Sequence, residues 1–168
     1  RDLHTAYRRQ RQMCIRDSNL IKCSNRLLLI KNNDKLVLID TGFGNKRDEK
    51  YYSYKYFFGD NELKKNIKKL GFSLDEITDV IITHLHDDHI GGAVEYNKNK
   101  ELEIVFKNAD FWISKQQWDW AVNPNKREVA AYFPENFMPL KKSGRLHLIN
   151  EENEYIENIY FKIYNGHT

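Results

Sequence analysis

The feature that most constrains this chain is a short apolar run that passes directly into a cluster of histidines and aspartates. The run is Asp79-Val80-Ile81-Ile82-Thr83, and the cluster His84-Leu85-His86-Asp87-Asp88-His89 follows it without a break. β-Branched residues favour a buried strand, and a strand end is a rigid platform on which alternate side chains converge. Imidazole nitrogen and carboxylate oxygen are ligands of zinc and similar ions. The pattern predicts a metal site at the end of a strand.

The spacing within this cluster divides its ligands into two groups. His84 and His86 are two residues apart, so both side chains point the same way if the chain stays extended. Asp88 and His89 reach a second position only after the chain turns. A polar loop with histidines placed by chance is disfavoured, because protonated histidines at this spacing repel one another without any folding gain. The Gly-Gly pair that follows is predicted to let the backbone pass close to the metals and to open a helix.

The segment from Thr83 to Gly92 resembles the His-x-His-x-Asp-His signature of the metallo-β-lactamase superfamily of hydrolases. The resemblance implies that the first two histidines of the cluster join a later histidine on one metal ion. It also implies that Asp88 and His89 serve a second ion, and Asp88 is the candidate catalytic residue as well.

Two further segments are similar to that family. The last residues, Tyr164-Asn165-Gly166-His167-Thr168, resemble its Gly-His-Thr segment, which makes His167 the implied third ligand of the first ion. Asp40-Thr41-Gly42 resembles the family's Asp-Thr-Gly segment, where the carboxylate helps to anchor the loops beside the metals. An aspartate that caps a turn is an equally good interpretation. Asp40 is therefore a candidate for supporting the metal ligands and not for binding metal itself.

The resemblance also implies the fold. The implied fold is mixed α/β (α+β), a four-layer αββα sandwich. Residues 19–168 are expected to form its N-terminal half to two-thirds. The family's bridging aspartate and last histidine follow the Gly-His-Thr segment, so they would lie beyond Thr168. We therefore expect this fragment, expressed as it stands, to bind the second ion weakly, to fold poorly and to be inactive.

The chemistry implied is hydrolysis by a metal-activated hydroxide, because a bound metal ion lowers the pKa of water from 15.7 toward about 7. Two Zn²⁺ ions are expected in a complete domain, with manganese or iron as alternatives. Relatives that reduce oxygen or nitric oxide on a di-iron centre carry Glu where this chain has His86, so the sequence favours a hydrolase.

The middle of the chain narrows the substrate class. Residues 118–120, 123–124, 133–140 and 144–146 are similar to the branch of N-acyl homoserine lactonases and methyl-parathion hydrolases. This similarity implies a small-molecule lactone or related ester as substrate. A hydroxyacylglutathione-type thioesterase and a non-catalytic metal-binding relative are the alternatives.

The net charge of +3 could suggest a nucleic-acid partner, but the excess lies in residues 1–18. Residues 1–17 match the translation of a sequencing adapter, with Ser18 at the join, so we exclude them as non-native. Removing their five arginines and two aspartates leaves equal numbers of basic and acidic residues. We therefore expect neither a nucleic-acid nor a membrane partner, and no apolar run reaches the ~20 residues of a membrane span. A homodimer and a cytoplasmic location are expectations that the sequence leaves open.

Short apolar runs and turn residues predict alternating strands and helices between residues 19 and 168. The expected elements are a hairpin of buried strands at 27–30 and 36–39, a helix at 61–70 with Leu63, Ile67 and Leu70 inward and Gly71 as its cap, a turn at 73–77, a strand at 79–83, strands at 103–106 and 111–113, a helix capped by Ser114 that runs to Ala121, a short irregular or helical piece between Pro134 and Pro139, and strands at 144–149 and 159–164.

Aromatic residues form the remaining pattern. The run Tyr51-Tyr52-Ser53-Tyr54-Lys55-Tyr56-Phe57-Phe58 is expected to pack on the core, and a lid or substrate wall is the alternative. Trp112, Trp118 and Trp120 are expected to be packing residues, because no polar groups converge beside them. His147 lies in an alternating strand and is expected to be an exposed or hydrogen-bonded strand residue.

Overall fold

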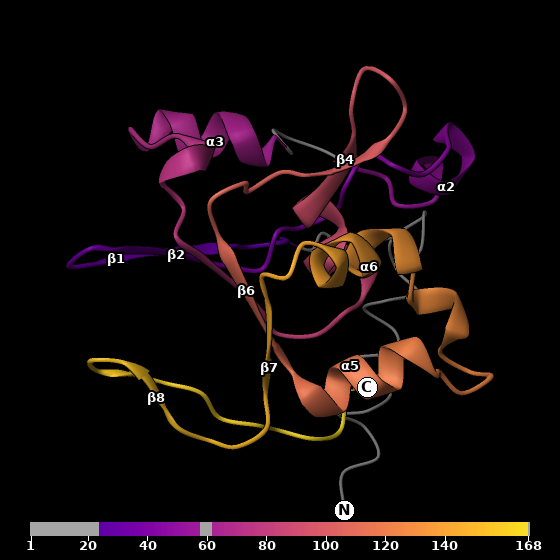
Figure 1. Ribbon diagram of the computed structural model, residues 1–168. Helices are drawn as coiled ribbons and strands as arrows, with labels where there is room; N and C mark the ends of the chain where they lie inside the picture. Colours follow the sequence, from indigo (N-terminus) through magenta and orange to yellow (C-terminus); the bar gives the residue numbers. More distant parts are fainter. Residues whose placement is uncertain (1–23, 58–61, 168) are drawn as a thin grey trace, which may run out of the picture.

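A five-stranded sheet is the centre of the computed structural model, which describes residues 24–57 and 62–167. The strand order is β1-β2-β3-β6-β7, and the bounds are β1 Leu28–Asn32, β2 Lys35–Ile39, β3 Asp79–Ile82, β6 Asp110–Ser114 and β7 Leu146–Ile149 (Figure 1). The β1–β2 pair is antiparallel, and every other pair is parallel. The carboxyl ends of β2, β3, β6 and β7 therefore lie at one edge of the sheet, where ligands bind in many open α/β sheets. The predicted adapter segment lies outside the described residues.

The predicted hairpin at the start of the fold is confirmed, but only one of its strands is buried. Leu28 to Asn32 pair with Ile39 to Lys35, and Asn33 takes the left-handed conformation that the tight turn needs, with φ of 49°. β2 lies inside the sheet and Val37 is fully buried. β1 is the edge strand and Leu28 is 55% exposed, so the prediction of two buried strands was wrong for β1.

The first predicted helix is α3, Leu63–Lys69, and the structure describes it from Glu62 onward. Ile67 is buried and Leu63 packs on the core, as the helical spacing predicts. Leu70 is 64% exposed, which corrects its inward assignment, because the helix has already ended there. Gly71 follows with φ of +87°, a left-handed conformation that favours glycine.

Short 3-10 turns and helices connect the strands. They are α2 Glu49–Ser53, η1 Leu74–Glu76, α4 Asp87–Ile90, η2 Gly91–Ala93, α5 Lys115–Val122, η3 Val129–Ala131 and α6 Pro134–Lys142. Ser114 caps α5 as predicted, since its side chain accepts a hydrogen bond from the backbone N–H of Gln117. α6 starts at Pro134 but continues through Pro139, so that proline does not end the helical piece as expected.

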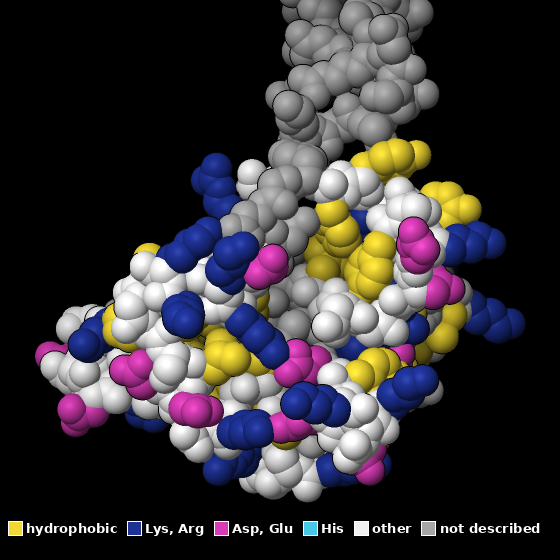
Figure 2. All heavy atoms as spheres, turned by 90° about the horizontal axis from the view of Figure 1, so that it is seen from above, with side chains coloured by type: hydrophobic (Ala, Val, Ile, Leu, Met, Phe, Trp, Pro, Cys, Tyr) yellow, Lys and Arg dark blue, Asp and Glu magenta, His cyan; other side chains and the backbone are white. Residues whose placement is uncertain are grey.

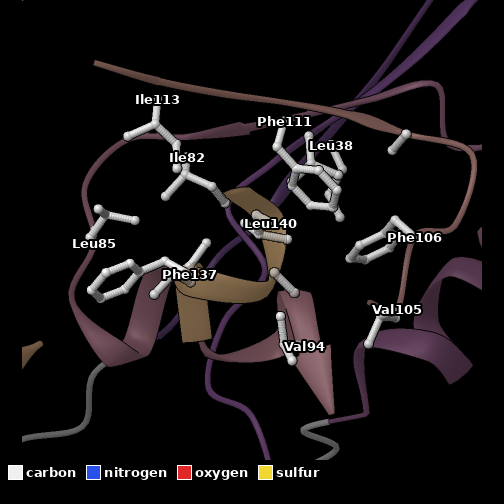
Figure 3. Packing of buried hydrophobic residues seen from close by; sticks show 14 of the residues in the cluster. Leu38, Ile82, Leu85, Val94, Val105, Phe106, Phe111, Ile113, Phe137 and Leu140 are labelled. Carbon is white, nitrogen blue, oxygen red and sulfur yellow. The ribbon is translucent and has the colours of Figure 1, made fainter. Parts of the chain in front are cut away.

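One hydrophobic cluster joins the helices to a single face of the sheet. Leu38, Ile82 and Phe111 point from the strands toward Phe137 and Leu140 of α6 (Figure 3). Other helical members of the cluster are Ile67 of α3, Ile90 of α4, and Trp118 and Ala121 of α5. This sheet with its layer of helices has the α/β arrangement of the αββα sandwich, as the sequence predicted.

Two small ribbons complete the fold. β4 Val94–Tyr96 pairs with β5 Leu102–Ile104, and β8 Glu154–Ile156 pairs with β9 Ile159–Tyr160. The strand expected at 103–106 therefore ends at Ile104, and the one expected at 159–164 covers two residues. Tyr155 of β8 contacts the ring of Trp112, so this ribbon lies on the sheet face opposite to the helices.

The surface carries charges of both signs. On the face shown in Figure 2, Lys and Arg side chains are interspersed with Asp and Glu, and a group of hydrophobic side chains is exposed among them. Among the described residues, no helix has the length and apolar character needed to cross a bilayer.

Candidate metal centre

The carboxyl end of β3 delivers the predicted ligands, as the sequence pattern suggested. All four residues of β3 are buried, the chain bends at Thr83, and His86 has an extended backbone as the N-cap of α4. α4 then turns the chain within one helical turn, because the N–H groups of His89 and Ile90 both donate to the carbonyl of His86, at 2.9 and 3.1 Å. His84 and His86 thus precede the turn, and Asp88 and His89 lie on it.

Three histidines converge at this edge of the sheet. His84, His86 and His167 each offer one ring nitrogen, and these donor atoms all lie within 4.8 Å of one another. The ring centroid of His167 is 4.8 Å from that of His84 and 5.3 Å from that of His86. The structure therefore brings together residues that are more than eighty positions apart in the sequence.

The facing nitrogens fit a shared metal ion. Nε2 of His84 lies 3.1 Å from Nδ1 of His86. Two nitrogens at 2.0–2.1 Å from one tetrahedral zinc ion are about 3.3 Å apart. His84 and His86 are half-buried and His167 is exposed, so the three-histidine set is open on one side.

The charge state of the two inner histidines also suits a metal. Burial, followed by the repulsion of neighbouring imidazoles, lowers the pKa of His84 to about 4. Burial and the nearby His167 lower the pKa of His86 in the same direction. Both rings are therefore neutral at pH 7, which is the form that binds a metal ion.

Asp40 supports the other half of the cluster. It follows β2 at the same sheet edge, is buried, and its Oδ2 lies 2.7 Å from Nδ1 of His89. This hydrogen bond, more than any other cause, raises the pKa of His89. Asp40 also accepts bonds from the backbone N–H of Thr83 at 2.8 Å and from its hydroxyl at 2.9 and 3.0 Å. The Asp40 carboxylate thus contacts His89, a predicted ligand, and Thr83, which immediately precedes the predicted ligand His84.

Asp88 and His89 lie side by side, as expected for a second position. Oδ2 of Asp88 is 3.5 Å from Nε2 of His89, and Nδ1 of the same ring is held by Asp40. The imidazole therefore presents Nε2 toward Asp88 on the open side of the cluster. The described residues provide these two groups for a second ion, and their role as ligands stays a prediction.

The Gly-Gly pair serves a different contact from the one expected. A Cβ atom on Gly91 would lie 2.5 Å from the backbone nitrogen of Gly44, and one on Gly92 would lie 2.3 Å from the carbonyl oxygen of Thr41. The close approach is to the loop after β2 and not to the metal position. The pair also follows α4 as the 3-10 turn η2 instead of opening a longer helix.

Sequence reasoning missed the role of Asp87, which occupies a variable position of the histidine signature. Its side chain is buried and accepts hydrogen bonds from the Tyr51 hydroxyl at 2.9 Å and from Nδ2 of Asn136 at 2.8 Å. No sequence signal marks this contact, because its three members come from α2, α4 and α6.

The aromatic run divides between the two expectations. Tyr51 and Tyr52 are half-buried, and the hydroxyl of Tyr52 donates to the carbonyl of Gly44 at 2.6 Å. Tyr54 and Tyr56 are exposed, at 68% and 60%. Phe57 packs edge-on against Phe43, with ring centroids 4.9 Å apart, so the run packs on the fold through Tyr51, Tyr52 and Phe57, and Phe58 lies outside the described residues.

Two of the three tryptophans pack as predicted. Trp118 is buried against Phe137, and Trp112 stacks on His147 and donates to Asp79 at 2.9 Å. Trp120 is 39% exposed and lines a surface hollow of about 720 Å³ beside α5. The stacked His147 is exposed, as expected for a strand residue outside the metal site.

Comparisons with known proteins agree with this geometry. The model of the metallo-beta-lactamase superfamily matches residues 23–103, which include β3 and four histidine-cluster residues with predicted metal roles. The anti-Pycsar protein Apyc1 of Bacillus phage 010DV004 is 28% identical over 109 residues, which are 55% of this chain and 41% of that protein. A probable metallo-hydrolase of Mycobacterium bovis is 30% identical over 78 residues, 42% of this chain and 25% of that protein.

Solved structures extend the similarity beyond the matched segment. A probable metal-dependent hydrolase from Staphylococcus aureus superposes with a TM-score of 0.75 at 23% identity, covering 92% of this chain and 54% of that one. AidC, a dizinc quorum-quenching lactonase solved with a homoserine product, superposes with a TM-score of 0.56 at 32% identity. The match covers 74% of this chain and 42% of AidC. The chain spans less than half the length of the curated relatives that it matches. Residues 23–103, which carry the histidine signature, are thus similar to the metallo-beta-lactamase superfamily, and the fold of the chain resembles that of the metal-dependent hydrolase.

Proposed function

We propose that the protein is a metal-dependent hydrolase that acts on a lactone or a related carboxylic ester. The observation that carries the proposal is the convergence of His84, His86 and His167, whose donor atoms lie within 4.8 Å of one another. Three histidines on an open edge are the ligand set of a catalytic zinc site, which keeps a position for water or substrate. Zinc is the metal that we expect, with manganese or iron as alternatives.

Each residue of the cluster has a defined part in this proposal. When bound, a divalent ion polarises the substrate carbonyl and makes water acidic enough to attack at neutral pH. His84, His86 and His167 would hold the first ion, and Asp88 and His89 would contribute to a second. Asp40 fixes the His89 ring through Nδ1, which keeps Nε2 free to face Asp88. Asp88 is our candidate for the group that receives a proton during hydrolysis.

The choice of a lactone or ester rests on similarity in the middle of the chain and on AidC. That protein is described as a quorum-quenching lactonase with two zinc ions, and it is 32% identical over the region it shares with this chain. His167 is exposed, so the histidine set can be reached from solvent.

A substrate panel tests this proposal. The full chain encoded by the gene is purified, its metal content is measured, and lactone, thioester, phosphotriester and β-lactam hydrolysis are assayed with and without a chelator. We expect lactone turnover that the chelator abolishes and that zinc restores. His86→Ala should remove this activity, and His147→Ala is the matched control, because His147 is an exposed histidine stacked on Trp112 outside the site.

The alternatives give different results in the same panel. Turnover of a glutathione thioester with no lactone hydrolysis would identify a thioesterase and overturn our substrate class. Metal binding without turnover of any substrate would support a non-catalytic metal-binding relative. The fragment of residues 19–168 should be assayed in parallel, because we propose that it is inactive by itself.

A further inference from the structure

We propose that Asp87 is a positioning residue that fixes the direction of Asp88 and His89 by fastening α4 to α2 and α6. This inference rests on the proposed metal site. Asp87 is the first residue of α4, and the N–H groups that close this helix donate to the residue before it. With a single turn, α4 has too few hydrogen bonds to hold its own orientation. Contacts made by its side chains must therefore set where its ligands point.

The side-chain contacts of Asp87 are made with α2 and α6. Its Oδ2 accepts a hydrogen bond from the Tyr51 hydroxyl at 2.9 Å, and its Oδ1 accepts one from Nδ2 of Asn136 at 2.8 Å. The carboxylate is 7% exposed and Asn136 is fully buried. A buried carboxylate is costly unless it is hydrogen-bonded, so these two bonds tie the carboxylate to one place. Asp88 and His89 follow Asp87 on the same helical turn, so the hydrogen bonds of Asp87 also fix their position.

The partners of Asp87 are themselves anchored. The ring of Tyr51 packs edge-on against Phe133, with centroids 5.9 Å apart. Arg47, just before α2, forms an ion pair with Glu135 of α6 and places its guanidinium 3.9 Å from the Phe133 ring centroid. α2 and α6 therefore contact each other through residues outside α4. The Asp87 carboxylate binds to residues of both helices, so α4 is attached to two elements that already contact each other.

The electrostatic setting favours the same arrangement. Burial raises the pKa of Tyr51, and its hydrogen bond to Asp87 adds to the effect, so the hydroxyl remains a donor at all moderate pH values. Lys46 is half-buried nearby and donates to the carbonyls of Gly91 and Val94, which follow α4. The start of α4 is therefore held by Asp87 and the residues after its end by Lys46.

Asp87→Asn is the conservative variant that the structure allows. The Oδ1 atom of Asn136 is buried and has no hydrogen-bond partner among the described residues. If Asn136 rotates its amide by 180°, that oxygen can accept a bond from the new Asn amide, while Tyr51 donates to the new Asn oxygen. Asp87→Asn should therefore keep both contacts, whereas Asp87→Ala removes both.

Asp79 provides the matched control. It is another buried aspartate held by side-chain hydrogen bonds, and Lys35 and the Trp112 indole each donate to it at 2.9 Å. It lies at the start of β3, and the ligands lie at the other end. Asp79→Ala should destabilise the fold as Asp87→Ala does, without disturbing metal ligands.

The first measurement is zinc competition with a chromogenic chelator on the full chain, under conditions where each variant is folded. We expect Asp87→Ala to weaken the second ion by about 10- to 100-fold, the usual effect of losing a support behind metal ligands, and to leave the first ion unchanged. Asp87→Asn should stay within about threefold of the wild type. Wild-type affinity in Asp87→Ala, an equal loss in Asp79→Ala, or a loss in Asp87→Asn as large as in Asp87→Ala would each overturn the proposal.

A second measurement separates this inference from the proposed function. Amide hydrogen exchange of the metal-free protein reports the order of α4 directly, through the N–H groups of His89 and Ile90. We expect Asp87→Ala to speed their exchange about tenfold or more relative to the strands, and Asp79→Ala to leave that ratio unchanged. If the wild type binds no second ion, the proposed function is wrong in that respect, and this measurement still decides the role of Asp87. If Asp87→Ala does not fold, Tyr51→Phe and Asn136→Ala each remove one contact, and normal exchange in both would overturn the inference.

Discussion

The carboxylate of Asp40 and the imidazole of His89 form a direct pair, with Oδ2 and Nδ1 2.7 Å apart, although the two residues are 49 positions apart in the sequence. Asp40 adopts φ of 59°, a left-handed conformation that aspartate tolerates better than most residues. Its N–H donates to the carbonyl of Ile81 at 2.9 Å. The backbone turn after β2 and the side-chain bonds therefore point the carboxylate at the metal loop.

Two substitutions of Asp40 distinguish the effect of its charge from the effect of its hydrogen bonds to Thr83. Asp40→Asn keeps an acceptor for Thr83 and a side chain suited to positive φ, so we expect a small loss of stability. Asp40→Ala leaves the part-buried Thr83 N–H without its acceptor, so we expect a larger loss, of about 1 kcal/mol. Both variants should weaken zinc binding by about 10- to 100-fold, because His89 loses its anionic partner. Urea unfolding and zinc competition measure the two effects, and unchanged zinc affinity in both variants would contradict this role.

A methyl group at Gly91 should be among the most damaging small changes in the chain. It would meet the Gly44 nitrogen at 2.5 Å and the Gly42 carbonyl oxygen at 3.1 Å, and backbone atoms cannot move aside as a side chain can. We expect Gly91→Ala to lower the free energy of unfolding by about 3 kcal/mol or more.

Gly71→Ala is the control for that substitution. Gly71 has φ of +87° and no atom within 4 Å of the added methyl group, so only backbone strain of about 1–2 kcal/mol applies. Urea unfolding of both variants checks the order. An equal loss in the two would show that the crossing of the two backbones is looser than the structure indicates.

Local pattern was enough to predict much of the fold. The apolar run before His84 and the Ser114 cap each depend on neighbours in sequence, and both were confirmed. Errors occurred where tertiary contacts decide the outcome. Pro139 continues α6 because the helix packs into the core on both sides of it, through Phe137 and Leu140. β8 and β9 form a ribbon with a turn at Asn158, so the alternation after Ile159 does not continue as a strand.

In the candidate site too, the sequence predicts what depends on neighbouring residues and not what depends on tertiary contacts. The convergence of His84 and His86 follows from their spacing at a strand end. His167 was assigned by resemblance only, since no spacing rule places a residue 81 positions beyond His86 beside it. The bonds of Asp87 had no sequence signal at all, because they depend on how α2 and α6 pack.

The stability of the protein should depend on pH through Lys46. Burial, which outweighs the attraction of Asp87, lowers the pKa of Lys46 from 10.5 to about 8. Between pH 8 and 10.5 the unfolded chain then binds more protons at this residue than the folded chain does. The free energy of unfolding contributed by Lys46 must therefore rise with pH across this window.

Lys46→Gln isolates this effect, because glutamine keeps a donor for the Gly91 and Val94 carbonyls but does not titrate. Urea unfolding from pH 7.5 to 10 should show the wild type gaining stability relative to the variant as pH rises. Tyrosines and other lysines contribute equally to both proteins and cancel in the difference. Parallel curves for the two proteins would show that Lys46 is solvated in the folded state.

Zinc should stabilise the folded chain through the three histidines, and His167 is the residue at which this can be measured most cleanly. His167 is exposed and no hydrophobic core residue depends on it, so His167→Ala should leave the unfolding free energy of the metal-free protein within about 0.5 kcal/mol of the wild type. Zinc at a hundred times its dissociation constant adds about 2.7 kcal/mol to a protein that binds it only when folded. We expect this increment in the wild type and in His147→Ala, and its loss in His167→Ala at the same zinc concentration. Thermal unfolding with zinc and with a chelator measures it, and an undiminished zinc increment in His167→Ala would remove that residue from the metal site, leaving His84 and His86 to bind the ion with other ligands.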